Sequence, residues 1–135
     1  MLKITQEIIE EIIVHGRSES PLEACGYLAE KDGVVCKYIA MKNVDASPVH
    51  YSMEPKEQFN AVRSCRAAGL TIRAVCHTHP ETAAYPSKED IKLAYDPDLS
   101  YVIVSLAETR PTIHSFIIRK NNVIQEDIEI IGAQK

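Results

Sequence analysis

The stretch LTIRAVCHTHP, residues 70–80, is an apolar run rich in β-branched residues that ends in two histidines and a proline. This composition predicts a β-strand, which Pro80 ends because proline has no backbone N–H to give to a sheet. Alternate residues of a strand face the same side about 6.5 Å apart, so His77 and His79 can approach one ion while Thr78 points into the opposite layer. The run therefore predicts a strand with a candidate metal-binding pair at its end.

Helical and strand-like patterns alternate on both sides of this strand. Apolar residues recur at the helical period in some segments, and they alternate or run continuously in others. This order predicts a single α/β or α+β domain over residues 1–135, with a mixed central sheet and about three helices packed on it. The expected elements are a helix over 4–15, a hairpin of strands 26–29 and 34–40, a helix from 55 to 69, the strand 70–76 leading into His77, a helix over 88–95, and strands over 101–106, 112–118 and 123–131.

The composition excludes several classes of protein. A chain of 135 residues, 45% of them hydrophobic, can bury one core, and no run approaches the ~18 apolar residues of a membrane span. The first residues lack the apolar block of a signal peptide, so we expect a cytoplasmic location without membrane association. The net charge of −4 is spread along the chain without a Lys/Arg cluster, which argues against a nucleic-acid partner.

The four cysteines do not suggest a metal site of their own. Their separations leave no C-x-x-C pair, so a cysteine-based zinc ribbon is not expected. We expect them to be reduced and mostly buried as small hydrophobic residues. They are Cys25, Cys36, Cys65 and Cys76.

A third metal ligand is expected from Asp90, on the first turn of the helix that follows the histidine pair. Ser87 and Asp90 form an S-x-x-D pattern, which by itself is ordinary helix capping. The two roles are compatible, because a helix whose N-terminus faces the ion lets Ser87 cap the helix and present its hydroxyl to a substrate oxygen. Two imidazoles and one carboxylate leave the fourth position of tetrahedral zinc open for a water, whose pKa falls towards ~7.

A hydrolytic site of this kind also needs a base that accepts the proton of the water. The candidate is Glu23, in the segment PLEACG at residues 21–26, directly before the first strand of the hairpin. Local sequence alone describes Glu23 as an exposed loop carboxylate. Its role therefore depends on tertiary structure and on a likeness to known proteins.

Glu23, the His77-x-His79-Pro80 segment and Ser87-x-x-Asp90 together resemble the JAMM motif of the MPN+ zinc metalloproteases. The likeness covers nearly the whole chain. The short length and the PLEACG segment are similar to the compact prokaryotic branch, the sulfur-carrier-protein (CysO-cysteine-type) peptidases. The resemblance implies a single MPN-like (cytidine-deaminase-like) domain.

The resemblance also implies a role for each matched residue. His77, His79 and Asp90 would bind one zinc ion. Glu23 would accept the proton of the water and return it to the leaving amine, while Ser87 would hydrogen-bond the developing oxyanion. The implied reaction is hydrolysis of a peptide or isopeptide bond at the C-terminus of a ubiquitin-like or sulfur-carrier protein, or in a peptide.

Two positions depart from the family pattern. Glu81-Thr82 follows the His-Pro pair where many members have a glycine, and Thr78 stands where the prokaryotic branch often has serine. The first departure affects the loop that would line the substrate channel. Neither removes a metal ligand or the base.

Other metalloenzymes share part of this pattern. His79-Pro80-Glu81 matches the H-x-E half of the cytidine deaminases, but no cysteine follows Cys76 to supply their P-C-x-x-C half. Amidohydrolases with H-x-H need a barrel of ~250 residues. A two-His-one-carboxylate Fe(II) enzyme and a non-catalytic MPN-type binding module stay open, although Glu23 and Ser87 favour hydrolysis.

The remaining candidates carry less chemistry. We expect His15 and His114 to be structural or surface residues. For His50 and Tyr51, before the second helix, two roles stay open: lining a substrate groove, or packing and surface exposure. The sequence also leaves the oligomeric state open, with a homodimer as one option.

Overall fold

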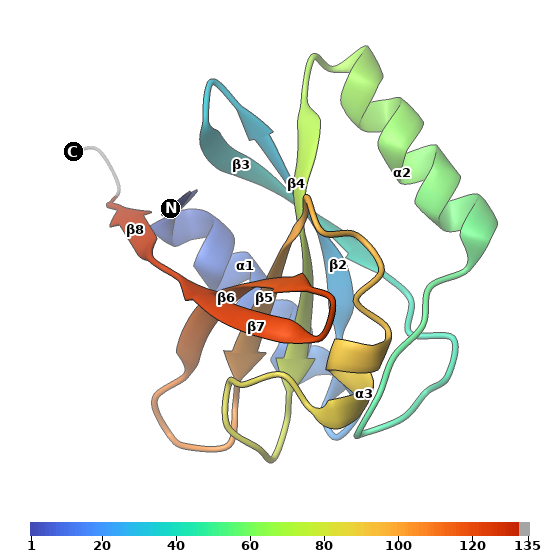
Figure 1. The fold of residues 1–135 in the computed structure, drawn as a ribbon, viewed down its shortest axis with the longest axis vertical. Coiled ribbons are helices and arrows are strands. Elements are labelled where there is room, and N and C mark those ends of the chain that lie inside the picture. The colour runs from blue at the N-terminus through green and yellow to red at the C-terminus, as the bar shows by residue number, and fades with distance from the viewer. Residues whose placement is uncertain (133–135) are drawn as a thin grey trace.

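Eight strands and three helices make up residues 1–132, the part of the chain that the computed structural model describes (Figure 1). The strand predicted from residues 70–80 lies near the centre of the sheet, whose order is β7-β6-β5-β4-β2-β3-β1-β8. The elements are β1 (Leu2–Thr5), α1 (Gln6–Glu19), β2 (Cys25–Lys31), β3 (Val34–Met41), α2 (Pro55–Ala67), β4 (Thr71–His79), α3 (Lys88–Lys92), β5 (Ser100–Ser105), β6 (Thr112–Arg119), β7 (Asn122–Glu126) and β8 (Ile128–Ile131). The mixed sheet with three helices confirms the predicted fold class, and the last three positions of the predicted domain lie outside the described residues.

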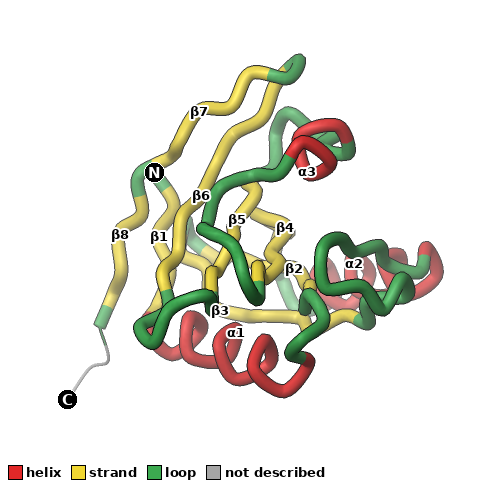
Figure 2. Tube along the Cα trace, turned by 90° about the horizontal axis from the view of Figure 1, so that it is seen from below, coloured by secondary structure: helices red, strands yellow, loops and turns green. Residues whose placement is uncertain are grey.

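Helices cover both faces of the sheet (Figure 2). On one face, Ile8 and Ile12 of α1 pack against Ala74 and Cys76 of β4 in the main core. Two smaller clusters lie on the other face beneath α2 and α3. Their buried members are Cys25, Tyr27, Met41 and Ala61 in one, and Ala84, Tyr101, Ile103, Phe116 and Ile118 in the other. Because side chains alternate along a strand, β4 presents its histidines to the face that carries α2 and α3.

Thr78 points into the layer opposite the histidines, as predicted, and that layer is formed by α1. A Cβ added at Gly16 of α1 would lie 2.8 Å from Thr78 Cγ2, closer than atoms can pack. Glycine at this position therefore lets α1 approach β4 directly behind the two histidines. Thr78 also holds the start of β2, because its Oγ1 accepts a hydrogen bond from the Ala24 N–H at 2.9 Å.

One segment near the C-terminus forms both edges of the sheet. β7 pairs antiparallel with β6 at one end of the strand order, and β8 pairs parallel with β1 at the other. Only Asp127 separates these two strands, and its carbonyl accepts a hydrogen bond from the Leu2 N–H at 2.8 Å. The sheet therefore curves until its first and last strands are joined by a single residue, and Figure 2 shows β8 following β7 after a short connection.

The predicted helix over 4–15 is wrong at both ends. Ile4 belongs to β1, where it is fully buried and pairs with Val35 and Ile130, and α1 begins only at Gln6. Thr5 caps the helix by accepting a hydrogen bond from the Ile8 N–H at 3.3 Å. The helical spacing of isoleucines correctly predicts α1 from Ile8 onward. Ile4 fits the same spacing by coincidence, but it lies in β1 because it pairs with β3 and β8.

Two later predictions also need correction. The run 123–131 is not one strand. Its residues before Asp127 pair with β6 as part of β7, and its residues after Asp127 pair with β1 as β8. The third helix ends at Lys92 instead of Tyr95. The chain after this helix is held by the Tyr101 hydroxyl, which donates to the Asp96 carbonyl at 3.2 Å and accepts from the Asp96 N–H at 3.1 Å.

The cysteines agree largely with expectation. Cys25, Cys65 and Cys76 are buried, Cys36 is exposed, and all four are free thiols.

Among residues 1–132, each helix is too short or too polar to cross a bilayer.

Candidate active site

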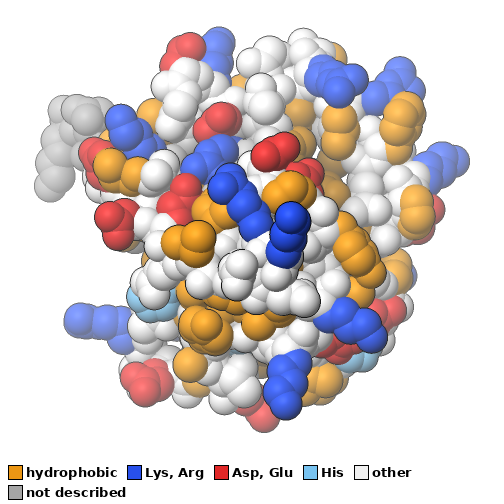
Figure 3. All heavy atoms as spheres, viewed as in Figure 1, with side chains coloured by type: hydrophobic (Ala, Val, Ile, Leu, Met, Phe, Trp, Pro, Cys, Tyr) orange, Lys and Arg blue, Asp and Glu red, His pale blue; other side chains and the backbone are white. Residues whose placement is uncertain are grey.

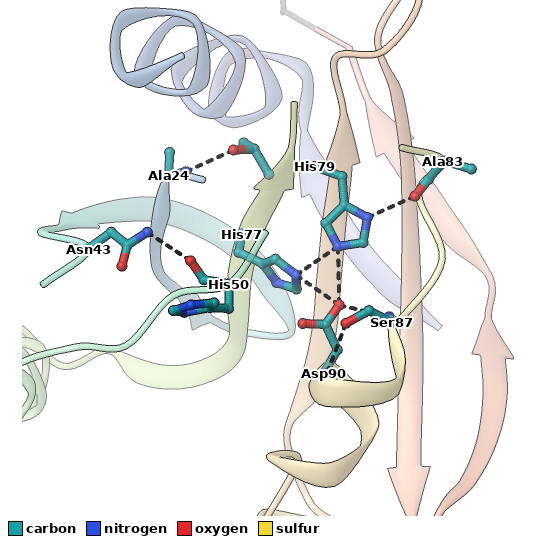
Figure 4. Close-up of polar contacts among 9 residues, drawn as sticks. Ala24, Asn43, His50, His77, His79, Ala83, Ser87 and Asp90 are labelled. Atoms are coloured by element: carbon teal, nitrogen blue, oxygen red, sulfur yellow. Dashed lines mark hydrogen bonds and ion pairs between the residues drawn. The ribbon is translucent and has the colours of Figure 1, made fainter. Parts of the chain in front are cut away.

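The carboxyl end of β4 brings two histidine rings together. His77 and His79 are each 3% exposed, and their Nε2 atoms lie 3.1 Å apart (Figure 4). The backbone here is held on both sides, since His77 pairs with Cys25 of β2 and with Ile103 of β5. Because β4 pairs with a strand on each side, the backbone that carries the two rings is held in place.

Helix α3 delivers the carboxylate that the sequence predicted. Asp90 Oδ2 lies 3.2 Å from His77 Nε2 and 3.1 Å from His79 Nε2. The same oxygen accepts the Ser87 N–H at 2.9 Å, and Ser87 Oγ accepts the Asp90 N–H at 3.0 Å, which completes a capping box. The capping role and the ligand-like position of Asp90 thus occur together.

These three atoms have the spacing of a metal site. Their separations of 3.1, 3.1 and 3.2 Å are close to the ~3.3 Å between ligands of a tetrahedral zinc ion with bonds of about 2.0 Å. His79 Nδ1 lies 2.8 Å from the Ala83 carbonyl, so it donates there and leaves the Nε2 lone pair for an ion. The donor set therefore fits zinc, and three donors leave the fourth position of a tetrahedral ion for a further ligand.

Glu23 lies beside this set, although local sequence describes it as exposed. It is 3% exposed, and one carboxylate oxygen lies within 4.8 Å of ligand atoms on both His77 and His79. Its Oε1 is buried without a hydrogen-bond partner among residues 1–132. The antiparallel pairing of β2 with β4 brings Glu23 to the histidines, because Cys25 lies directly opposite His77.

The surroundings shift the pKa values of the two carboxyl groups in opposite directions. Burial raises the pKa of Glu23 to about 8, and the nearby Asp90 adds to this rise. Burial would also raise the pKa of Asp90, but the contacts with the His77 and His79 imidazoles hold its pKa well below its usual range. The site thus combines a permanently ionised carboxylate with a carboxyl group that can exchange a proton near neutral pH.

The two histidines also differ. Burial lowers the pKa of His77. Burial opposes the charge on His79 as well, but bonds to Asp90 and the Ala83 carbonyl raise its pKa overall. His77 is therefore the imidazole more readily kept neutral, the form that binds metal.

A cleft of about 470 Å³ opens beside His77 and Asp90. Its walls come from the loop before α2, from α2 and α3, and from the sheet, and they are mostly apolar or aromatic. Hydrophobic side chains are also visible on the face that carries α3 and β7 (Figure 3). Both His50 and Tyr51 line the cleft, Tyr51 also packs against the core cluster beneath α2, and the Tyr51 ring centroid lies 4.6 Å from that of His77.

One residue of this region escaped the sequence analysis. Asn43 is 5% exposed and its amide donates to the carbonyls of Glu23 and His50, both at 3.0 Å. It lies in a loop with no catalytic motif, and only the N-x-D turn pattern with Asp45 hints at its backbone bonding. His15 and His114 lie elsewhere and bond Tyr38 and Gln125.

A mixed sheet covered by helices, with two histidines, an aspartate at a helix start and a buried glutamate converging at the end of a central strand, defines a domain of the JAB/MPN class. The family model described as prokaryotic homologs of the JAB domain matches residues 5–118. The chain belongs to this family.

Individual relatives agree with this assignment. The CysO-cysteine peptidase of Mycobacterium tuberculosis is 33% identical over 134 residues, which cover 97% of this chain and 92% of the relative. The solution structure of a Desulfitobacterium hafniense protein has a TM-score of 0.91 and 42% identity, covering 98% of this chain and 94% of that one. A JAB1/MPN domain protein from Archaeoglobus fulgidus shares the fold, with a TM-score of 0.66 at 16% identity and 97% of each chain covered.

Proposed function

We propose that this protein is a zinc-dependent peptidase that hydrolyses a peptide or isopeptide bond at the C-terminus of a ubiquitin-like or sulfur-carrier protein. The observation that carries the proposal is the convergence of His77 Nε2, His79 Nε2 and Asp90 Oδ2 within 3.2 Å of one another, beside the buried Glu23 carboxyl group. A metal site alone fits several reactions, and the adjacent buried carboxyl group favours hydrolysis.

His77, His79 and Asp90 would hold one zinc ion. When bound there, zinc supplies a Lewis acid that polarises the scissile carbonyl and lowers the pKa of the attacking water. Asp90 contributes the negative charge of the set, and its capping bonds with Ser87 keep the carboxylate pointed at the imidazoles.

Glu23 acts as the general base and then as the general acid. Its Oε1, which has no hydrogen-bond partner in the described part of the chain, leaves an acceptor for the proton of the attacking water, and its carboxyl group then delivers this proton to the leaving nitrogen. Burial supports both steps because it moves the pKa of Glu23 towards neutrality, where a group can accept and release a proton with little cost.

Ser87 stabilises the oxyanion that forms on the scissile carbonyl. Its Oγ uses a lone pair to accept the Asp90 N–H, so the hydroxyl hydrogen is left to donate to a substrate oxygen. Donors placed where negative charge develops lower the barrier to acyl transfer.

The substrate class follows from the cleft and the relatives. An apolar cleft of about 470 Å³ beside His77 and Asp90 suits the tail of a protein substrate more than a charged metabolite. The M. tuberculosis relative, which matches nearly the whole chain, is a CysO-cysteine peptidase. A small carrier protein whose C-terminus bears an added residue or adduct is therefore the substrate proposed here.

The test is cleavage of ubiquitin-like and sulfur-carrier proteins from the same cell, each extended at its C-terminus and followed by mass spectrometry. We expect the zinc-loaded protein to release the extension, and a chelator-treated sample not to. Glu23→Gln should retain zinc but lose activity by at least ~100-fold, the lower range for general acid–base catalysis. Cleavage by Glu23→Gln at the wild-type rate would remove Glu23 from the mechanism.

A further inference from the structure

The two imidazoles of the candidate metal site are held in different ways. His79 has the usual support of a ligating histidine, because its Nδ1 donates to the Ala83 carbonyl at 2.8 Å. His77 lacks this support, since its Nδ1 is buried and has no hydrogen-bond partner among residues 1–132. Something other than a hydrogen bond from Nδ1 must set the orientation of the His77 ring.

Tyr51 is placed to do this. Its ring centroid lies 4.6 Å from that of His77 with an interplanar angle of 31°, so the two rings stack against each other in a tilted arrangement. By contrast, His77 and His79 meet edge-on at 4.9 Å and 62°. A stacked aromatic ring restricts rotation of the imidazole about its Cβ–Cγ bond without needing a polar partner.

One buried side chain bonds the backbone on both sides of Tyr51. The Asn43 amide donates to the His50 carbonyl at 3.0 Å, and its oxygen accepts the Ser52 N–H at 3.3 Å. The backbone is therefore pinned immediately before and after Tyr51. Asn43 also donates to the Glu23 carbonyl at 3.0 Å, so the stacking ring and the proposed base are held by the same residue.

We propose that Tyr51 is a positioning residue for His77, and that its ring takes the place of the hydrogen bond that His77 Nδ1 lacks. Tyr51 acts through the imidazole, and its aromatic face, not its hydroxyl, is what matters. The inference rests on the metal site of the proposed function, but it concerns metal binding and does not depend on which bond the protein cleaves.

The experiment measures zinc affinity by competition with a chromogenic chelator in the absence of substrate. Tyr51→Leu removes the aromatic face and should weaken zinc binding by ~10–100-fold, the usual effect of losing support for a ligating histidine. Tyr51→Phe keeps the face and should bind zinc like the wild type. Tyr95→Leu is the matched control, because Tyr95 lines the same cleft, is 80% exposed and should not affect zinc.

A second measurement on metal-free protein separates positioning from general stability. The imidazole ¹⁵N–¹H correlation signals of His77 should be sharp in the wild type and Tyr51→Phe but broadened in Tyr51→Leu, while those of His79 stay sharp because Ala83 anchors it. If Tyr51→Leu does not fold, Tyr51→Met replaces it in both measurements, because methionine is apolar and flexible enough to fill the space of the lost ring. Wild-type zinc affinity in either aliphatic variant overturns the inference, even if the protein is an active peptidase. Zinc binding with no peptidase activity instead contradicts only the proposed function.

Discussion

Glu23 and Asp90 are two carboxyl groups in one buried site, yet their surroundings drive their pKa values apart. For Glu23 burial dominates, because its Oε1 has no hydrogen-bond partner among residues 1–132 to stabilise the charge there. For Asp90 the contacts with His77 and His79 outweigh burial. Side chains of the same chemistry thus suit different tasks because of where each lies.

Asp90→Asn tests the ligand role at this scale. The amide oxygen can still accept the Ser87 N–H, so α3 keeps its cap, but the site loses its negative charge. We expect zinc affinity to fall by at least ~100-fold, more than for loss of a supporting contact, and zinc to be lost on dialysis. Metal analysis of the dialysed protein measures this.

Ser87→Ala is the matched control for Asp90→Asn. It removes the other half of the capping box and should cost about 0.5–2 kcal/mol of stability, but it should leave one zinc per chain. Unchanged zinc content in dialysed Asp90→Asn would count against Asp90 as a ligand.

Four residues of the candidate site are predictable from local sequence, and the fifth is not. His77, His79, Ser87 and Asp90 follow from short-range spacing, since a strand and a helix start place them without reference to the rest of the chain. The burial of Glu23 has no local signal, because it depends on the pairing of Cys25 with His77 across the sheet. Only the resemblance to a known motif identified Glu23 before the structure.

At the scale of elements, the loop between β3 and α2 has no regular structure, and hydrogen bonds to one side chain hold much of its backbone. Asn43 bonds the backbone of five residues, at 3.0 to 3.4 Å. They are Glu23, Asp45, Ser47, His50 and Ser52. The loop can thus form a wall of the cleft without a helix or strand of its own.

Asn43→Ala should therefore destabilise the protein strongly. The Glu23 and His50 carbonyls would lose their bonds to this amide, and we expect a loss of about 2–4 kcal/mol in the free energy of unfolding. Chemical denaturation of metal-free protein measures this. Asn60→Ala, on the exposed face of α2, is the control and should change stability by less than about 0.5 kcal/mol. Equal effects of the two substitutions would contradict the role of Asn43.

At the scale of the whole molecule, a partly buried ionic network supports the curved part of the sheet. Glu126, the last residue of β7, accepts hydrogen bonds from Arg73 of β4 at 2.8 Å, Ser100 of β5 at 2.6 Å and Ser115 of β6 at 2.8 Å. Arg73 also lies 3.5 Å from Glu30 of β2. Side chains from five strands are thus joined next to the residue where the chain changes from one sheet edge to the other.

This network makes stability depend on pH in a defined direction. Burial opposes the charge on Glu126, but bonds from Ser100, Arg73 and Ser115 hold its pKa below the usual value of 4.5. Because the pKa is lower in the folded state, the stabilisation is fully present above the unfolded-state value and is lost as pH falls through the folded-state value.

Glu126→Gln should be less stable than the wild type at about pH 7, and the difference should shrink as the pH falls below about 4.5. Urea unfolding across this range measures it. A constant difference at every pH would show that the charge of Glu126 does not contribute.

The order of elements along the chain was predictable, and the order of strands in the sheet was not. Local patterns located most helices and strands, with errors where an apolar run served a different element, as at Ile4 and Asp127. Pairing between β1 and β8 joins residues 2–5 to residues 128–131, and nothing in either segment identifies the other. Such contacts depend on the packing of the whole molecule.

The pairing of β1 with β8 also has a consequence for how the protein is made. β8 is translated long after β1, so one side of β1 has no partner until residues 128–131 have left the ribosome. During that time the apolar side chains of Leu2 and Ile4, which are buried in the finished molecule, belong to an open sheet edge. Newly made chains are therefore expected to need protection from association until β8 has been made, and folding limited by this long-range closure should be slow.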